Sequence, residues 1–163
     1  RTDLAALLLK AGQTAEAEEL ALQAVKNFPK DAKGWFVLGR AQEKKGEAKA
    51  AEKSYFEAVK LDRGMAGAWT NLGILSAKRG DEKTALTCYV SAVQADPFDT
   101  EAQYNLGRAL VISKKDHERG VRLLFSAAKG RGEAAERAKK FIADLETIAK
   151  DGDPGWKAAD KRL

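Results

Sequence analysis

The sequence contains one cysteine and one histidine in 163 residues. Because a disulfide needs two cysteines, and a zinc centre needs several cysteine or histidine ligands, Cys88 alone excludes an intrachain disulfide and a cysteine zinc site. His117 stands in the charged segment K-K-D-H-E-R, where we expect a solvated side chain. No pattern gives Cys88 or any serine a catalytic base, and there is no glycine-rich phosphate loop. We therefore expect a protein that is not an enzyme and has no cofactor.

Long apolar stretches are also missing. No run approaches the roughly 20 residues that a membrane-spanning helix needs, and no signal-peptide pattern is present. We expect no membrane span, and the compartment stays open, with the cytoplasm slightly favoured. Only three prolines interrupt segments that are rich in alanine and poor in β-branched residues. These absences predict an all-α protein.

The sequence does contain a pattern that recurs every 34 residues. Tryptophan recurs at Trp35 and Trp69, and a Leu-Gly pair recurs at residues 38–39, 72–73 and 106–107. A period of this length is typical of stacked helical repeats, in which each unit buries its apolar face only against its neighbours.

Each unit has the pattern of two helices. In the unit from Ala32, we expect one helix from Lys33 to Lys45, ended by Gly46, and a second from Ala48 to Leu61. Small residues allow two such helices to cross closely. They recur on the facing stripes at Gly39, Ala51 and Ala58.

These recurring residues resemble the tetratricopeptide repeat, in which W-x-x-L-G is followed by small, aromatic and proline positions. The resemblance implies a right-handed superhelix of about four helix pairs over residues 1–131, with capping helices over residues 133–163. The expected units are 1–31, which lacks its first three positions, 32–65, 66–99 and 100–131. The truncated first unit predicts that the chain is a fragment of a longer array.

Local chemistry predicts several helix boundaries. Pro97 stands between two units, where one helix must end. Thr100 and Gln103 predict a capping box at the start of the fourth unit, and we expect one extra residue in the turn that follows Ser113. A last short helix is expected to begin at Asp153.

The resemblance implies that the first helices of the units line a concave groove for a peptide or helical segment of a partner protein. Asn71 and Asn105 can donate and accept hydrogen bonds with a peptide backbone, although such asparagines are also common repeat composition. Arg40 and Arg108 favour acidic groups. Carried over position by position, the expected peptide-binding residues are Phe36, Arg40, Lys44, Thr70, Asn71, Ile74, Lys78, Tyr104, Asn105 and Arg108.

Some members of the family bind a C-terminal carboxylate with a clamp of lysine, arginine and asparagine. This sequence has Phe36, Val37 and Glu101 at clamp positions of its last three units, and Thr2 and Ala6 at those of its first three. We therefore do not expect an adaptor of that kind.

Two alternatives to groove binding follow from other residues. Exposed Leu4, Leu7 and Leu8 would let the chain stack on a second copy as a homo-oligomeric assembly module. Cations near the ends of the first helices could form a basic ridge, but cations there also complement the helix dipole, and no aromatic residues accompany them for stacking on bases. We therefore do not expect a nucleic-acid partner. The ridge residues are Lys10, Lys44, Lys45, Lys78, Arg79, Lys114 and Lys115.

Overall fold

The computed structural model describes residues 1–150, and this part of the chain forms nine helices and no strand. The predicted all-α class is confirmed, while the short helix expected at Asp153 lies outside the described residues. Within the described range, no helix has both the length and the apolar character needed to cross a membrane. The helices are α1 (Thr2–Lys10), α2 (Thr14–Asn27), α3 (Ala32–Lys44), α4 (Ala48–Leu61), α5 (Ala66–Lys78), α6 (Glu82–Ala95), α7 (Thr100–Ser113), α8 (His117–Ala128) and α9 (Glu133–Lys150).

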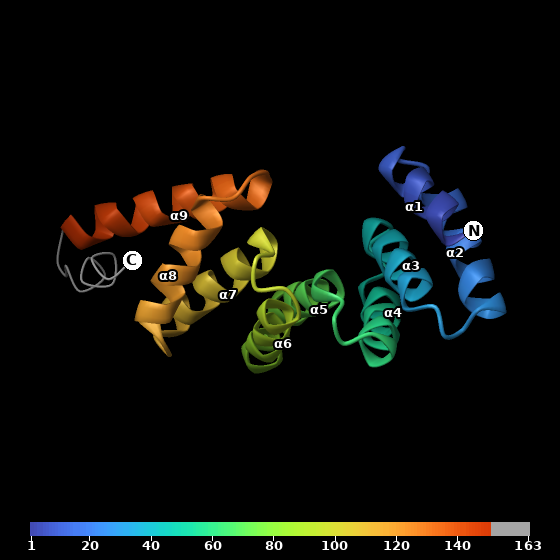
Figure 1. The fold of residues 1–163 in the computed structure, drawn as a ribbon, viewed down its shortest axis with the longest axis horizontal. Coiled ribbons are helices and arrows are strands. Elements are labelled where there is room, and N and C mark those ends of the chain that lie inside the picture. Colours follow the sequence, from blue (N-terminus) through green and yellow to red (C-terminus); the bar gives the residue numbers. More distant parts are fainter. Residues whose placement is uncertain (151–163) are drawn as a thin grey trace.

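The helices pack as consecutive pairs, α1 with α2, α3 with α4, α5 with α6 and α7 with α8. Figure 1 shows these pairs following one another in a row, with α9 across the α7–α8 pair at the far end. Odd-numbered helices also touch, α1 with α3, α5 with α7 and α7 with α9. The described residues therefore do not share one hydrophobic core. Their buried apolar residues form a series of clusters between neighbouring helices.

Glycine sets the distance between the two helices of a pair. A Cβ on Gly39 would lie 2.7 Å from the ring of Tyr55, and Gly73 and Tyr89 are in a similarly close contact. Both rings are buried. The recurring Leu-Gly pair is thus a packing requirement, because any larger residue at the glycine would push the aromatic ring out of its place.

A recurring hydrogen bond attaches α3 and α5 to the loop before each of them. The indole Nε1 of Trp35 donates to the Pro29 carbonyl at 2.9 Å, and that of Trp69 donates to the Arg63 carbonyl at 3.0 Å. Both bonds span six residues, so they fix the angle at which the chain enters the next unit.

The fourth unit keeps this bond without tryptophan. Gln103 stands one period after Trp69, and its Nε2 donates to the Pro97 carbonyl at 2.7 Å. The predicted capping box is therefore wrong, because Gln103 is used elsewhere. Asp99 caps α7 instead, and its side chain accepts from the Ala102 amide at 2.8 Å.

The helix ends show where the fourth unit differs from the others. Gly46 and Gly80 follow α3 and α5 with φ angles of 82° and 83°, which glycine adopts without strain. After α7, Lys114 takes the left-handed conformation at φ 55°. The α7 helix has 14 residues where α3 and α5 have 13. The extra residue expected in the turn therefore lengthens α7 itself.

Candidate functional site

The predicted groove residues lie on α3, α5 and α7, but they differ in exposure. Lys44 and Lys78 are exposed. Five residues are half-buried, namely Phe36, Arg40, Asn71, Ile74 and Arg108, and three are buried, namely Thr70, Tyr104 and Asn105. Burial thus separates the side chains that lie on the open surface from those that are packed between helices.

The two asparagines are not equivalent. Asn105 is only 3% exposed, and its Nδ2 donates to the Glu101 carbonyl oxygen at 2.9 Å and to Glu101 Oε1 at 3.1 Å. These bonds occupy the amide hydrogens inside α7. Asn71 is half-buried, and its side chain interacts with the Tyr55 hydroxyl.

The α3 side of the site is built around a buried tyrosine. The Tyr55 hydroxyl donates to Glu43 Oε2 at 2.8 Å, and burial together with the Glu43 charge raises the pKa of Tyr55. Lys78 Nζ lies 3.8 Å from Glu43 Oε1. The Phe36 ring centroid is 5.9 Å from that of Tyr55, and the Arg40 guanidinium carbon is 6.0 Å from the Phe36 centroid. The charged and aromatic side chains of this cluster therefore find their hydrogen-bond, ion-pair and ring contacts within the cluster itself.

The α7 side contains a hollow of about 390 Å³ between α5, α6, α7 and α9. It brings together five of the predicted residues, namely Ile74, Lys78, Tyr104, Asn105 and Arg108. It also includes Ala77, Glu82, Tyr89 and Arg137, which the sequence analysis did not select.

The α9 helix contributes Arg137 to the wall of this hollow. The Arg137 guanidinium carbon of α9 lies 4.7 Å from the centre of the Tyr104 ring, and Arg137 Nη2 donates to Glu101 Oε1 at 2.6 Å. The sequence predicts a capping helix here and assigns no role to Arg137. No sequence pattern points to Arg137, because its contacts with Tyr104 and Glu101 depend on how α9 crosses α7.

Ion pairs between units lie along the predicted basic ridge. Lys45 Nζ contacts Glu18 Oε2 at 2.5 Å, and one period later Arg79 Nη1 contacts Glu52 Oε2 at 2.7 Å. Lys44 Nζ donates to the Leu9 carbonyl at 3.0 Å. Because these cations already have partners, the ridge offers less free positive charge to a polyanion than the sequence suggests.

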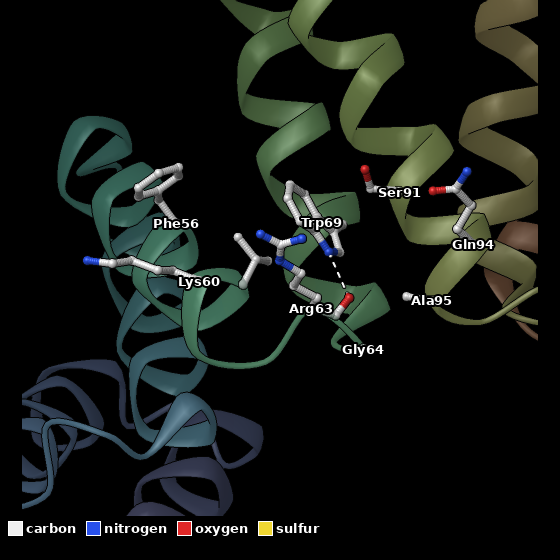
Figure 2. A pocket seen from close by; sticks show the side chains of 9 residues that line it. Phe56, Lys60, Arg63, Gly64, Trp69, Ser91, Gln94 and Ala95 are labelled. Atoms are coloured by element: carbon white, nitrogen blue, oxygen red, sulfur yellow. Dashed lines mark hydrogen bonds between the residues drawn. The ribbon is translucent and has the colours of Figure 1, made fainter.

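A larger hollow of about 710 Å³ lies between α4 and α6, away from the predicted groove residues. Figure 2 shows its wall, with Phe56 from α4, Trp69 from α5 and Gln94 from α6, and the dashed line marks the bond from Trp69 to Arg63. Phe56 is 57% exposed. This surface is open and partly apolar.

Stacked helix pairs with a 34-residue period, and hollows between successive units, define a helical-repeat scaffold. A family model described as tetratricopeptide repeat matches residues 2–68 and 70–139. The chain therefore belongs to the tetratricopeptide repeat family, as its sequence pattern predicts. Proteins of this family bind other proteins and are generally scaffolds without catalysis, and this chain is in general terms a protein–protein interaction scaffold.

Solved structures share the fold at low sequence identity. A crystal structure of MamA is 22% identical with a TM-score of 0.67, and the match covers 85% of this chain and 78% of that one. A MamA double mutant is 21% identical with a TM-score of 0.71, covering 98% and 86%. A mutant O-GlcNAc transferase from Thermobaculum terrenum is 22% identical with a TM-score of 0.68, over 78% of this chain and 25% of the enzyme. No curated protein matches the sequence.

Proposed function

We propose that this chain binds an extended or helical segment of a partner protein, without catalysis, in the groove along α3, α5 and α7. The proposal takes the chain as four units over residues 1–131 followed by a cap. The observation that carries it is the hollow of about 390 Å³, because five residues chosen from the repeat alignment meet there. The binding residues proposed are Phe36, Arg40, Lys44, Thr70, Asn71, Ile74, Lys78, Tyr104, Asn105 and Arg108.

The groove is suited to binding because its walls exist before a ligand arrives. Tyr104 is held by Arg137, and Phe36 is packed beside Tyr55. A preorganised surface loses little conformational entropy on association, so that a short segment can bind with useful affinity. Arg40 and Asn71 then offer polar contacts at its edge.

Affinity capture with the intact chain tests the groove. We expect Arg40→Ala combined with Asn71→Ala to weaken partner binding by about 5- to 30-fold, since polar contacts at the edge of an interface are each worth about 0.5–1 kcal/mol. Gln94→Ala is the matched control, because Gln94 is exposed and lies in the hollow of Figure 2. If the same partner bound the double variant and the control equally well, the groove assignment would be wrong.

A second candidate function is self-association through the first helix pair. Leu4 and Leu7 on α1 are 51% and 60% exposed, whereas Leu8 is half-buried against the first core cluster. Two neighbouring exposed leucines favour contact with a second copy. Sedimentation equilibrium of the chain and of Leu4→Lys combined with Leu7→Lys tests this. A monomer at every concentration would remove the candidate.

A further inference from the structure

Two tyrosines in successive units differ in what their hydroxyl groups meet. Tyr55 and Tyr89 are one period apart and are 0% and 1% exposed. Tyr55 donates to the Glu43 carboxylate at 2.8 Å. The residue one period after Glu43 is Ala77, and the Tyr89 hydroxyl has no hydrogen-bond partner within residues 1–150. Since buried polar groups are nearly always paired, Tyr89 lacks an acceptor that its counterpart has.

Tyr89 lines the hollow of about 390 Å³ described above, and this hollow contains two further hydrogen-bond donors without an acceptor among the described residues. Arg108 Nε and Arg137 Nε are buried and without a partner among the described residues, and both side chains line the hollow with Tyr89. All three missing bonds are donations, from one hydroxyl and two guanidinium groups. A carboxylate has two oxygens that accept about four hydrogen bonds, so it is the group that best satisfies this set.

The charges around the hollow also favour an acidic ligand group. Arg137 is paired with Glu101, and Lys78 lies near Glu43. Arg108 has no ion pair within the described part of the chain, and Glu82 stands exposed on the lining. Arg108 is thus the cation whose charge is not balanced by a direct partner.

Tyr89 keeps its proton under ordinary conditions. Burial raises the pKa of Tyr89, the positive charge of Arg108 partly opposes that rise, and the charges of Glu82 and Glu101 add to it. The hydroxyl is therefore a donor at neutral pH, and Tyr89 and Arg108 line the same hollow.

We infer that the hollow receives the carboxylate of an aspartate or glutamate side chain of the partner segment, at the place that Glu43 fills in the preceding unit. Tyr89 and Arg108 donate to this carboxylate, and Ile74 and Tyr104 contact its methylene groups. The inference rests on the proposed groove and adds the chemical class that the groove recognises.

The direct test observes the Arg108 side chain. The probe is the blocked peptide acetyl-Ala-Ala-Glu-Ala-Ala-amide, with the glutamine peptide as its control. Each is titrated to about 10 mM, a range that suits a single weak contact, into the intact chain while the Nε–H resonance of Arg108 is followed by NMR. We expect a saturable shift with the glutamate peptide and none with the glutamine peptide.

Three variants sharpen the result. Ala77→Glu supplies a carboxylate from the chain itself, as Glu43 does for Tyr55, and we expect it to abolish peptide binding. Tyr89→Phe should weaken the affinity by about 10-fold or more, the effect of one charge-assisted hydrogen bond. Gln94→Ala, in the separate hollow of Figure 2, should leave the affinity unchanged. Circular dichroism checks that each variant is folded.

The inference is overturned if the glutamine peptide shifts Arg108 as strongly, if neither peptide gives a saturable shift, or if Ala77→Glu binds the glutamate peptide as the parent does. Preference for a phosphoserine peptide over the glutamate peptide would also overturn it. Capture of a protein partner distinguishes failure of the acidic-pocket inference from failure of the proposed groove function. If Ala77→Glu and Tyr89→Phe keep that partner while the Arg40–Asn71 variant loses it, the groove stands and the acidic pocket does not.

Discussion

Single residues in this chain occupy equivalent positions with different surroundings, and the two buried tyrosines are the clearest case. Tyr55 and Tyr89 both lie against a glycine of the preceding helix. Glu43 accepts a hydrogen bond from Tyr55, whereas Ala77, at the matching position, offers Tyr89 none. The repeat thus keeps the packing role of the ring while the role of the hydroxyl changes.

This difference predicts opposite effects of one substitution. Tyr55→Phe should destabilise the fold by about 1.5–3 kcal/mol, because it removes a hydrogen bond to a charged group. Tyr89→Phe should be neutral or slightly stabilising, because it removes a buried hydroxyl that has no partner among the described residues. Urea unfolding followed by circular dichroism measures both. A loss of stability in Tyr89→Phe as large as in Tyr55→Phe would show that the Tyr89 hydroxyl has an acceptor after all.

At the scale of the helix, small residues decide how closely two helices approach. Ala58 is fully buried on α4, in the cluster that contains Tyr55. We expect Ala58→Leu to destabilise the fold by about 1–3 kcal/mol through overpacking. Ala48→Leu is the matched control, since Ala48 begins the same helix and is exposed. Thermal melts of the two variants measure the effect, and equal melting temperatures would contradict this reading of the crossing.

Much of each helix could be predicted from the sequence, because glycine stops and apolar spacing are local signals. The second helix of the Ala32 unit is found over Ala48–Leu61 as expected, and the first begins and ends one residue earlier than expected. The predicted capping box was wrong because Gln103, like Trp69, donates a hydrogen bond to the loop before its helix. Only the three-dimensional contacts reveal this shared role.

The candidate site was harder to predict than the helices. The repeat alignment selects residues by their position on a helix, and two of the residues it selected, Arg108 and Ile74, line one hollow. It did not select Tyr89, because a tyrosine at a packing position gives no sign that its hydroxyl is unsatisfied. The change from Glu43 to Ala77 was a readable signal, but its meaning requires knowing that residue 43 touches the tyrosine.

For the molecule as a whole, a series of local cores implies that stability is local as well. Ion pairs such as Lys45–Glu18 and Arg79–Glu52 connect neighbouring units only, and exposed pairs of this kind contribute little to stability. In a stacked array, a change in one cluster is felt mainly by its nearest neighbours. The two ends of the described chain should therefore respond independently.

Two leucines provide a matched test of this independence. Leu9 lies in the cluster formed by α1, α2 and α3, and Leu124 lies in the cluster formed by α7, α8 and α9, and both are fully buried. Each change to alanine should cost about 2–5 kcal/mol where it acts. We expect Leu9→Ala to reduce hydrogen-exchange protection in α1 to α3 while α7 to α9 stay protected, and Leu124→Ala to do the reverse. Because the exchange of each helix is read separately, equal loss of protection at both ends in either variant would mean that the units unfold as one body, and the array would then be a single cooperative domain despite its divided core.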